Sequence, residues 1–160
     1  CVPILLAARD GSCVAAVHAG WRGLAAGIIQ QTIATLPAPA AGLIACIGPC
    51  IGRDAYQVGP EVIQHIADAG VEPVYQPSAP AGTTAPATAS VTDPAADIAS
   101  DASPRFQFDL GATAHASLRQ AGVGLVHSDA RCTCSDSARF FSYRRDGSTG
   151  RFAAYIAFTG

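Results

Sequence analysis

The sequence predicts an α+β fold, a mixed β-sheet sandwich flanked by helices. Its first two apolar segments are joined by a turn too short for a crossover, so the chain opens on an antiparallel hairpin. Later strand patterns alternate irregularly with helical ones, which is not the regular order of a doubly wound sheet. With 160 residues, the chain is long enough for one domain with a substantial core.

The opening hairpin is the clearest local pattern. Residues 2–7 form an apolar run that predicts a buried strand, and residues 13–18 predict the returning strand. Asp10-Gly11 between them is typical of a two-residue hairpin turn. The chain starts on this strand pattern without a polar lead-in, so we expect a further N-terminal part of the domain upstream of Cys1.

The middle of the chain predicts two helices on either side of a strand. Apolar residues recur on one side over residues 23–36, and Pro37 and Pro39 end that helix. Residues 43–47 form a short apolar strand. A second helix is expected over residues 60–69, where a proline occupies the first turn.

An Ala/Pro-rich segment, at about residues 76–104, interrupts the pattern. Burial of its small side chains cannot offset the entropy of ordering it, so we expect a flexible insertion. Order returns at residues 106–108, and Asp109 then caps a helix with apolar residues at four-residue spacing. Further strands are expected over residues 123–127, 140–143 and 152–158, with a turn at Asp146-Gly147.

Composition argues against several functions. All ten basic residues are arginines, so this segment contains no Schiff-base or P-loop lysine. A formal charge of −2 gives no electrostatic basis for binding nucleic acid or an anionic membrane, and no apolar run is long enough to span a bilayer. Six cysteines without a visible signal peptide predict reduced thiols and a cytoplasmic location.

The hairpin brings a thiol and an imidazole together. A two-residue loop places Pro3 opposite His18, and Cys1 then projects from the same face as His18. Zinc favours sulfur and nitrogen donors, so this pair could share one metal ion, although a catalytic zinc needs three protein ligands. The alternative is a small apolar cysteine beside a hydrogen-bonded surface histidine.

The run of six residues that begins at His18 carries further chemistry. It includes two glycines, the Trp21 ring and the Arg22 guanidinium, where a strand gives way to a helix. The ring offers a face on which a base can stack, and the guanidinium and the helix N-terminus suit a phosphate. The alternative is that the glycines only shape the turn.

Four motifs resemble, in order, those of the YfiH/laccase-domain family. They are Cys-Val-Pro-Ile-Leu at residues 1–5, Val-Ala-Ala-Val-His-Ala-Gly-Trp-Arg-Gly at residues 14–23, Ile-Gly-Pro-Cys-Ile-Gly at residues 47–52, and Phe-Phe-Ser-Tyr-Arg-Arg-Asp-Gly with Thr-Gly-Arg at residues 140–151. They cover nearly the whole chain apart from the insertion. The resemblance implies that residues 1–160 are the C-terminal two-thirds of one catalytic domain with a YfiH-like fold.

The resemblance also implies a metal site. In that family a zinc is held by His, Cys and His, and the Cys and the second His match Cys1 and His18. The first His lies upstream in the family, so the third ligand is expected before Cys1. Copper is a possible alternative, because the family's older label is a copper polyphenol oxidase.

The activity that the resemblance implies is phosphorolysis of purine nucleosides, with adenosine deamination as a companion activity. The nucleosides are adenosine, inosine, guanosine and methylthioadenosine, and the second substrate is phosphate. We expect Cys1 and His18 to be catalytic through the metal, and Trp21 to bind substrate. The arginines expected to bind substrate are Arg22, Arg144, Arg145 and Arg151.

Three other functions stay open. A copper-dependent, laccase-like polyphenol oxidase needs many imidazoles, whereas the chain has four histidines and no His-x-His pair. A cysteine hydrolase could use Cys1 as nucleophile and His18 as base. The third is an inactive fragment or binding module.

The remaining thiols and imidazoles carry weaker expectations. Cys50 is expected to be structural, and the one-residue spacing of Cys132 and Cys134 suits neither a zinc knuckle nor a thioredoxin-type pair. His65 is expected to be an ordinary residue on a helix surface.

Overall fold

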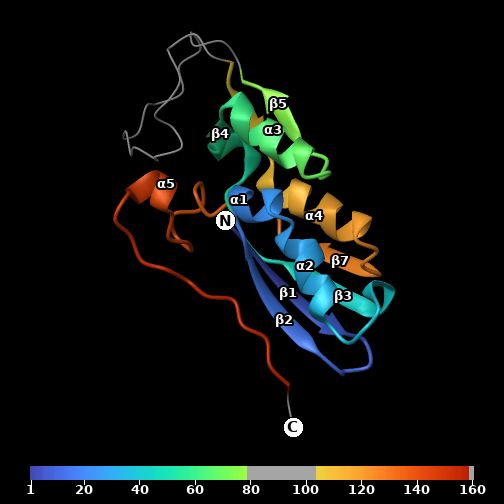
Figure 1. Ribbon diagram of the computed structural model, residues 1–160. Coiled ribbons are helices and arrows are strands. Elements are labelled where there is room, and N and C mark those ends of the chain that lie inside the picture. Colours follow the sequence, from blue (N-terminus) through green and yellow to red (C-terminus); the bar gives the residue numbers. More distant parts are fainter. Residues whose placement is uncertain (79–103, 159–160) are drawn as a thin grey trace.

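A computed structural model describes residues 1–78 and 104–158, and every structural statement below refers to them. Most of the expected insertion, residues 79–103, lies outside the described residues. The described part contains two sheets, five α-helices and two short 3₁₀ helices, Ala40–Gly42 and Arg53–Ala55 (Figure 1).

The larger sheet has four strands in the order β2-β1-β3-β7. Its central strand β1 (Val2–Ala8) pairs antiparallel with β2 (Val14–Ala19) and with β3 (Leu43–Ile47). In contrast, β3 pairs parallel with β7 (Leu125–Ser128). The sheet is therefore mixed, and the predicted α+β class is confirmed.

A smaller antiparallel sheet, in the order β4-β6-β5, lies at one end of the molecule. Its strands are β4 (Gln57–Val58), β5 (Tyr75–Pro77) and β6 (Phe106–Phe108), and α3 (Pro60–Asp68) follows β4. The last two residues of β5 were expected in the insertion. They join the sheet because Phe106 and Gln107 of β6 pair with them.

Helices α1 (Trp21–Ala25), α2 (Ile28–Thr35) and α4 (Leu110–Gln120) pack on one side of the larger sheet (Figure 1). The prediction of a single helix over residues 23–36 is wrong. The segment forms two helices because Gly27 between them adopts the left-handed conformation, with φ 72°.

The N-terminus of α4 follows the sequence expectation. The Asp109 carboxylate accepts a hydrogen bond from the backbone N–H of Ala112 at 2.8 Å. This bond satisfies one of the backbone donors that the first turn of a helix leaves unpaired. The predicted cap is confirmed.

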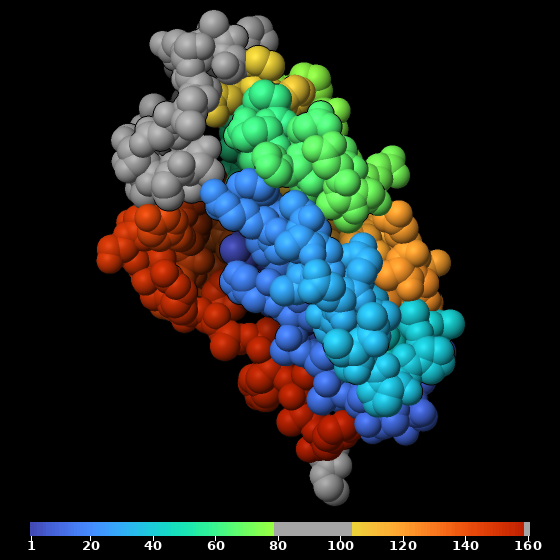
Figure 2. Space-filling view, in the orientation of Figure 1, coloured from blue at the N-terminus to red at the C-terminus, as the bar shows by residue number. Residues whose placement is uncertain are grey.

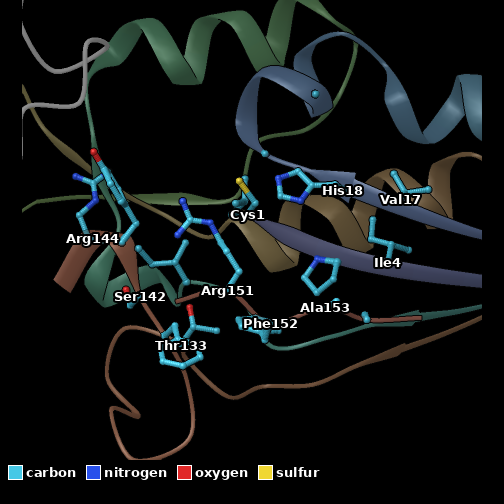
Figure 3. A pocket seen from close by; sticks show the side chains of 18 of the residues that line it. Cys1, Ile4, Val17, His18, Thr133, Ser142, Arg144, Arg151, Phe152 and Ala153 are labelled. Atoms are coloured by element: carbon cyan, nitrogen blue, oxygen red, sulfur yellow. The ribbon is translucent and has the colours of Figure 1, made fainter. Parts of the chain in front are cut away.

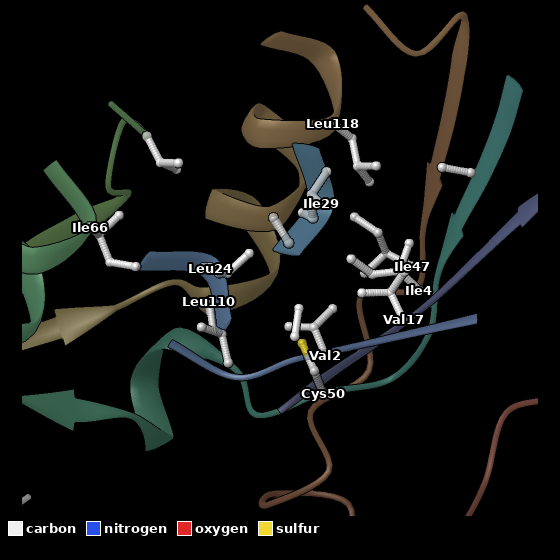
Figure 4. Packing of buried hydrophobic residues seen from close by; sticks show 14 of the residues in the cluster. Val2, Ile4, Val17, Leu24, Ile29, Ile47, Cys50, Ile66, Leu110 and Leu118 are labelled. Atoms are coloured by element: carbon white, nitrogen blue, oxygen red, sulfur yellow. The ribbon is translucent and has the colours of Figure 1, made fainter. Parts of the chain in front are cut away.

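One apolar cluster fills the space between the larger sheet and its helices (Figure 4). Val2 and Ile4 of β1 and Leu118 of α4 are each at most 1% exposed. Full burial of such a side chain stabilises the fold by about 1.5–3 kcal/mol. Alternate residues of β1, Pro3 and Leu5, face the other side of the sheet and are only half-buried.

The C-terminal third departs most from the sequence expectation. The strand expected over residues 140–143 is wrong, because Ser142 instead caps the short helix α5 (Tyr143–Asp146). The strand expected over residues 152–158 is also wrong, because these residues adopt no regular secondary structure and pair with no described strand (Figure 1). Tyr155 in this segment is 87% exposed.

Candidate functional site

A pocket of about 890 Å³ opens on the face of the β1–β2 hairpin that the helices leave uncovered. Its opposite wall comes from the C-terminal third, and Figure 2 shows the first residues in dark blue beside that red segment. Arg22, Arg144 and Arg151 line this pocket, and no described aspartate or glutamate does. Its charge therefore suits an anionic ligand.

Cys1 and His18 lie next to each other in this pocket (Figure 3). The predicted register is confirmed, because Pro3 pairs with His18 across the hairpin, so that both predicted side chains project from one face. A Cβ atom added to Gly20 would lie 3.1 Å from the Cys1 Sγ. The glycine after β2 therefore leaves the thiol its space.

The Cys1–His18 pair offers a sulfur and a nitrogen donor, which is the chemistry that zinc prefers. A catalytic zinc needs a third protein ligand. Residues 1–78 and 104–158 contain no group of three or more His, Cys, Asp or Glu side chains that could hold a metal ion. The pair thus fits part of a zinc site, and its role as a ligand pair stays a prediction.

Trp21 forms an aromatic wall of the pocket at the start of α1. The Arg22 Cζ lies 4.4 Å from the centroid of the indole ring. The His65 ring of α3 contacts the indole edge-on, with the centroids 6.0 Å apart, and the His65 Nδ1 lies 2.6 Å from the carbonyl oxygen of Glu61. His65, expected to be an ordinary surface residue, therefore supports the aromatic wall.

Arg144 is held on a second aromatic ring. Its Cζ lies 5.3 Å from the ring centroid of Tyr56, and Tyr56 in turn contacts the fully buried Phe108 at 6.0 Å. In the described part of the chain, no carboxylate lies within ion-pair distance of Arg22, Arg144 or Arg151. A guanidinium stacked on a ring keeps its N–H edge available for a phosphate.

Arg145 is the one predicted arginine that does not line the pocket. Its guanidinium donates to three backbone carbonyl oxygens and to Asp146. The hydrogen bonds from Arg145 hold the pKa of the Asp146 carboxyl below its usual value. The two neighbours in the Arg-Arg pair therefore have different surroundings.

Several polar residues of the pocket were not predicted as site residues, among them Thr133, Ser142 and Tyr56. Thr133 and Ser142 are 8% and 7% exposed and line the pocket together with Tyr56. Ser142 could have been found, because it belongs to the Phe-Phe-Ser-Tyr motif. No sequence motif marks Tyr56. Its position depends on a residue far along the chain, because the Phe108 N–H donates a hydrogen bond to the Tyr56 carbonyl oxygen at 2.9 Å.

The backbones of Cys50 and Cys132 form an isolated parallel β-bridge near the pocket, and their free thiols differ in pKa. Burial raises the pKa of the Cys50 thiol to about 11. Burial also opposes ionisation of Cys132, yet hydrogen bonds from Ser135 and from the Gly52 N–H lower its pKa below the usual value. The Cys132 Sγ accepts the Gly52 bond at 3.1 Å.

The fold and the site together define an α+β protein with an arginine-lined pocket beside a thiol–imidazole pair. The chain belongs to the family described as multi-copper polyphenol oxidoreductase laccase, whose sequence model matches residues 1–159. The resemblance inferred from the four motifs is thereby confirmed. No helix in the described residues is long and apolar enough to cross a membrane.

Several curated relatives carry the name purine nucleoside phosphorylase. The Pseudomonas aeruginosa protein PA4543 is 39% identical over 158 residues, which are 98% of this chain and 56% of that protein. The Escherichia coli protein, purine nucleoside phosphorylase YfiH, is 33% identical over 156 residues, 98% of this chain and 55% of that protein. The chain thus spans about half the length of the relatives it matches.

Solved structures show the same fold. The Neisseria meningitidis protein NMB0706 is 36% identical and aligns with a TM-score of 0.71 over 94% of this chain and 53% of its own. YlmD from Geobacillus stearothermophilus is 29% identical, with a TM-score of 0.68 over 93% of this chain and 50% of its own.

Proposed function

We propose that the protein is a zinc-dependent purine nucleoside phosphorylase, with adenosine deamination as a companion activity. Adenosine, inosine, guanosine and methylthioadenosine are its proposed nucleosides, and phosphate is the second substrate. The names of the relatives support this reaction. The observation that carries it is a pocket with one tryptophan, three arginines and no described carboxylate.

The reaction makes two demands that this pocket can meet. Positive charge grows on the sugar ring as its bond to the base breaks, so phosphate must be held against the anomeric carbon. Arg22, Arg144 and Arg151 supply charge and N–H donors for that phosphate. The Trp21 ring supplies a face on which the purine base stacks.

Zinc enters the proposal through Cys1 and His18, together with a third donor outside the described residues. When bound, a zinc ion polarises phosphate or activates a water molecule, and the latter chemistry also serves deamination. The side chains of the pocket stack the base, bind the phosphate and keep the two substrates in contact. The compartment, proposed to be the cytoplasm, follows only from the cysteine content.

The test is incubation of the zinc-loaded full-length protein with adenosine and phosphate, followed by chromatography for adenine and ribose 1-phosphate. We expect both products, and Arg144→Gln is expected to lower kcat/KM for phosphate by about tenfold or more. Arg139→Gln is the matched control, because Arg139 pairs with Asp136 and does not line the pocket. A zinc-loaded sample that yields neither product refutes the phosphorylase.

The open alternatives are separated by the same samples. Phenol oxidation that requires bound copper, without nucleoside cleavage, would establish the polyphenol oxidase. Alkylation of Cys1 that zinc does not slow would favour the cysteine hydrolase, because a thiolate bound to the metal is protected. If no sample cleaves nucleosides, oxidises phenols or shows a reactive Cys1, the inactive fragment or binding module remains.

A further inference from the structure

We propose that Arg145 is a positioning residue that fixes the pocket wall carrying Arg144 and Ser142 without itself touching phosphate. The proposal rests on the proposed phosphorylase function. It assigns different tasks to two adjacent arginines that the sequence cannot distinguish.

The guanidinium of Arg145 has no N–H group to spare. Its Nη1 donates to the carbonyl oxygens of Thr133 at 3.1 Å and Cys134 at 2.8 Å, and its Nη2 donates to that of Phe140 at 2.9 Å. Its Nε and Nη2 each donate to an Asp146 carboxylate oxygen at 2.7 Å. A guanidinium carries five N–H donors, so these five bonds use them all. A phosphate could bind there only by displacing one of them.

These bonds join two separate stretches of the pocket wall. Thr133 belongs to one stretch, whereas Ser142 and Arg144 belong to the other, and all three line the pocket. Arg145 bonds to the carbonyl of Thr133 and of Phe140, and its backbone N–H donates to the Ser142 hydroxyl at 3.4 Å. It therefore ties the two stretches together at the start of α5.

Arg144 depends on this tie for its position. The Arg144 side chain lies on the Tyr56 ring, with its Cζ 5.3 Å from the ring centroid, and no described carboxylate forms an ion pair with it. If α5 shifts, the guanidinium leaves the ring and the pocket together. A lysine at position 145 would keep the charge but has three donors and no planar fork, so it cannot keep five bonds.

The experiment compares Arg145→Lys with the wild type in the full-length protein, varying phosphate and inosine separately. We expect KM for phosphate to rise about tenfold, with little change in KM for inosine. Trp21 is the single tryptophan, so quenching of its fluorescence measures inosine binding directly, and it should change less than about twofold. Arg131→Lys is the matched control, since Arg131 forms a comparable pair with Asp129 and does not line the pocket.

A double-mutant cycle separates positioning from direct contact. If Arg145 acts through Arg144, the Arg144→Gln/Arg145→Lys variant should bind phosphate no more weakly than Arg144→Gln alone. Additive losses would mean that Arg145 contacts phosphate itself, and an unchanged phosphate KM in Arg145→Lys would also overturn the proposal.

A readout without turnover keeps this inference distinct from the phosphorylase itself. Phosphate should raise the melting temperature of the wild type more than that of Arg145→Lys, whether or not ribose 1-phosphate forms. An inactive wild type that still shows this difference would refute the phosphorylase and keep the positioning role. Equal shifts in both proteins would refute the positioning role alone. A loss of folding in Arg145→Lys, seen by circular dichroism, would show a purely structural residue and contradict the proposal.

Discussion

The backbones of Cys50 and Cys132 form an isolated β-bridge, and both thiols are free. Their surroundings shift the two thiol pKa values in opposite directions. Burial raises the pKa of Cys50 to about 11, while three hydrogen bonds to its sulfur lower the pKa of Cys132 despite its partial burial. Only the thiolate reacts with an alkylating reagent. Burial therefore decides the chemistry of Cys50, whereas the backbone and hydroxyl donors around its sulfur decide that of Cys132.

We predict that iodoacetamide at pH 8 modifies Cys132 at least about tenfold faster than Cys50, because each pKa unit changes the thiolate fraction about tenfold. Peptide mass spectrometry over a time course measures both rates. The variant Ser135→Ala removes the hydroxyl donor to Cys132 and should slow its modification. Equal rates for the two cysteines would contradict the assignment.

At the scale of residues, every predicted site residue except Arg145 lines the pocket, and the residues that were missed have a physical cause. A fixed turn sets the register of a hairpin, so Cys1 and His18 could be placed side by side from the sequence. Arg144 and Arg145 could not be told apart, because the five acceptors of Arg145 come from residues as far away as Thr133. Spacing along the chain does not show which hydrogen-bond donors are already used.

At the scale of elements, Gly27 decides where α1 ends and α2 begins. Its φ of 72° is left-handed, a conformation that costs other residues about 1–2 kcal/mol. We predict that Gly27→Ala lowers the free energy of unfolding by about that amount, measured by urea denaturation. The control Gly23→Ala lies within α1, where an added Cβ meets only ordinary contacts at 3.5 Å and beyond, so it should not destabilise. Equal losses would contradict this role for Gly27.

The loop after β7 gives a prediction about pH. Hydrogen bonds from Arg131 lower the pKa of Asp129 to about 2, from a usual value near 3.8. A carboxyl with a lowered folded-state pKa stabilises the fold above its unfolded pKa, and this contribution is lost as the pH falls toward the folded one. The melting temperature should therefore fall between about pH 4 and pH 2 more steeply in the wild type than in Asp129→Asn. Parallel curves would contradict the pair's contribution.

Elements that depend on local chemistry were predicted, and those that depend on distant partners were not. The cap at Asp109 and the strand β3 follow from their own residues. Segment 152–158 has the composition of a strand, but a strand needs ladder hydrogen bonds to a partner, and none of the described strands pairs with it. For a related reason β5 was not predicted: the composition of Tyr75–Pro77 does not favour a strand, and the segment joins a sheet only because β6 pairs with it.

At the scale of the whole molecule, one apolar cluster connects the two sheets and the pocket. Phe108 of the smaller sheet is fully buried in that cluster and contacts Tyr56, on whose ring Arg144 lies. The Trp21–His65 contact joins α1 to α3 on the other side. Neither sheet has a separate core among the described residues, so we expect the chain to unfold as a single unit.

Unfolding in urea tests this expectation through two signals. Trp21 fluorescence reports on α1 beside the larger sheet, and far-ultraviolet circular dichroism reports on all helices and strands, so the two transitions should coincide. Phe108→Ala should lower the free energy of unfolding by about 3–5 kcal/mol and shift both transitions together, because a buried ring leaves a cavity. The control Leu125→Ala, at a side chain 38% exposed on the edge strand β7, should cost less than about 1.5 kcal/mol. If Phe108→Ala shifts the dichroism but leaves the Trp21 transition in place, the smaller sheet unfolds independently, and the core does not couple it to the pocket.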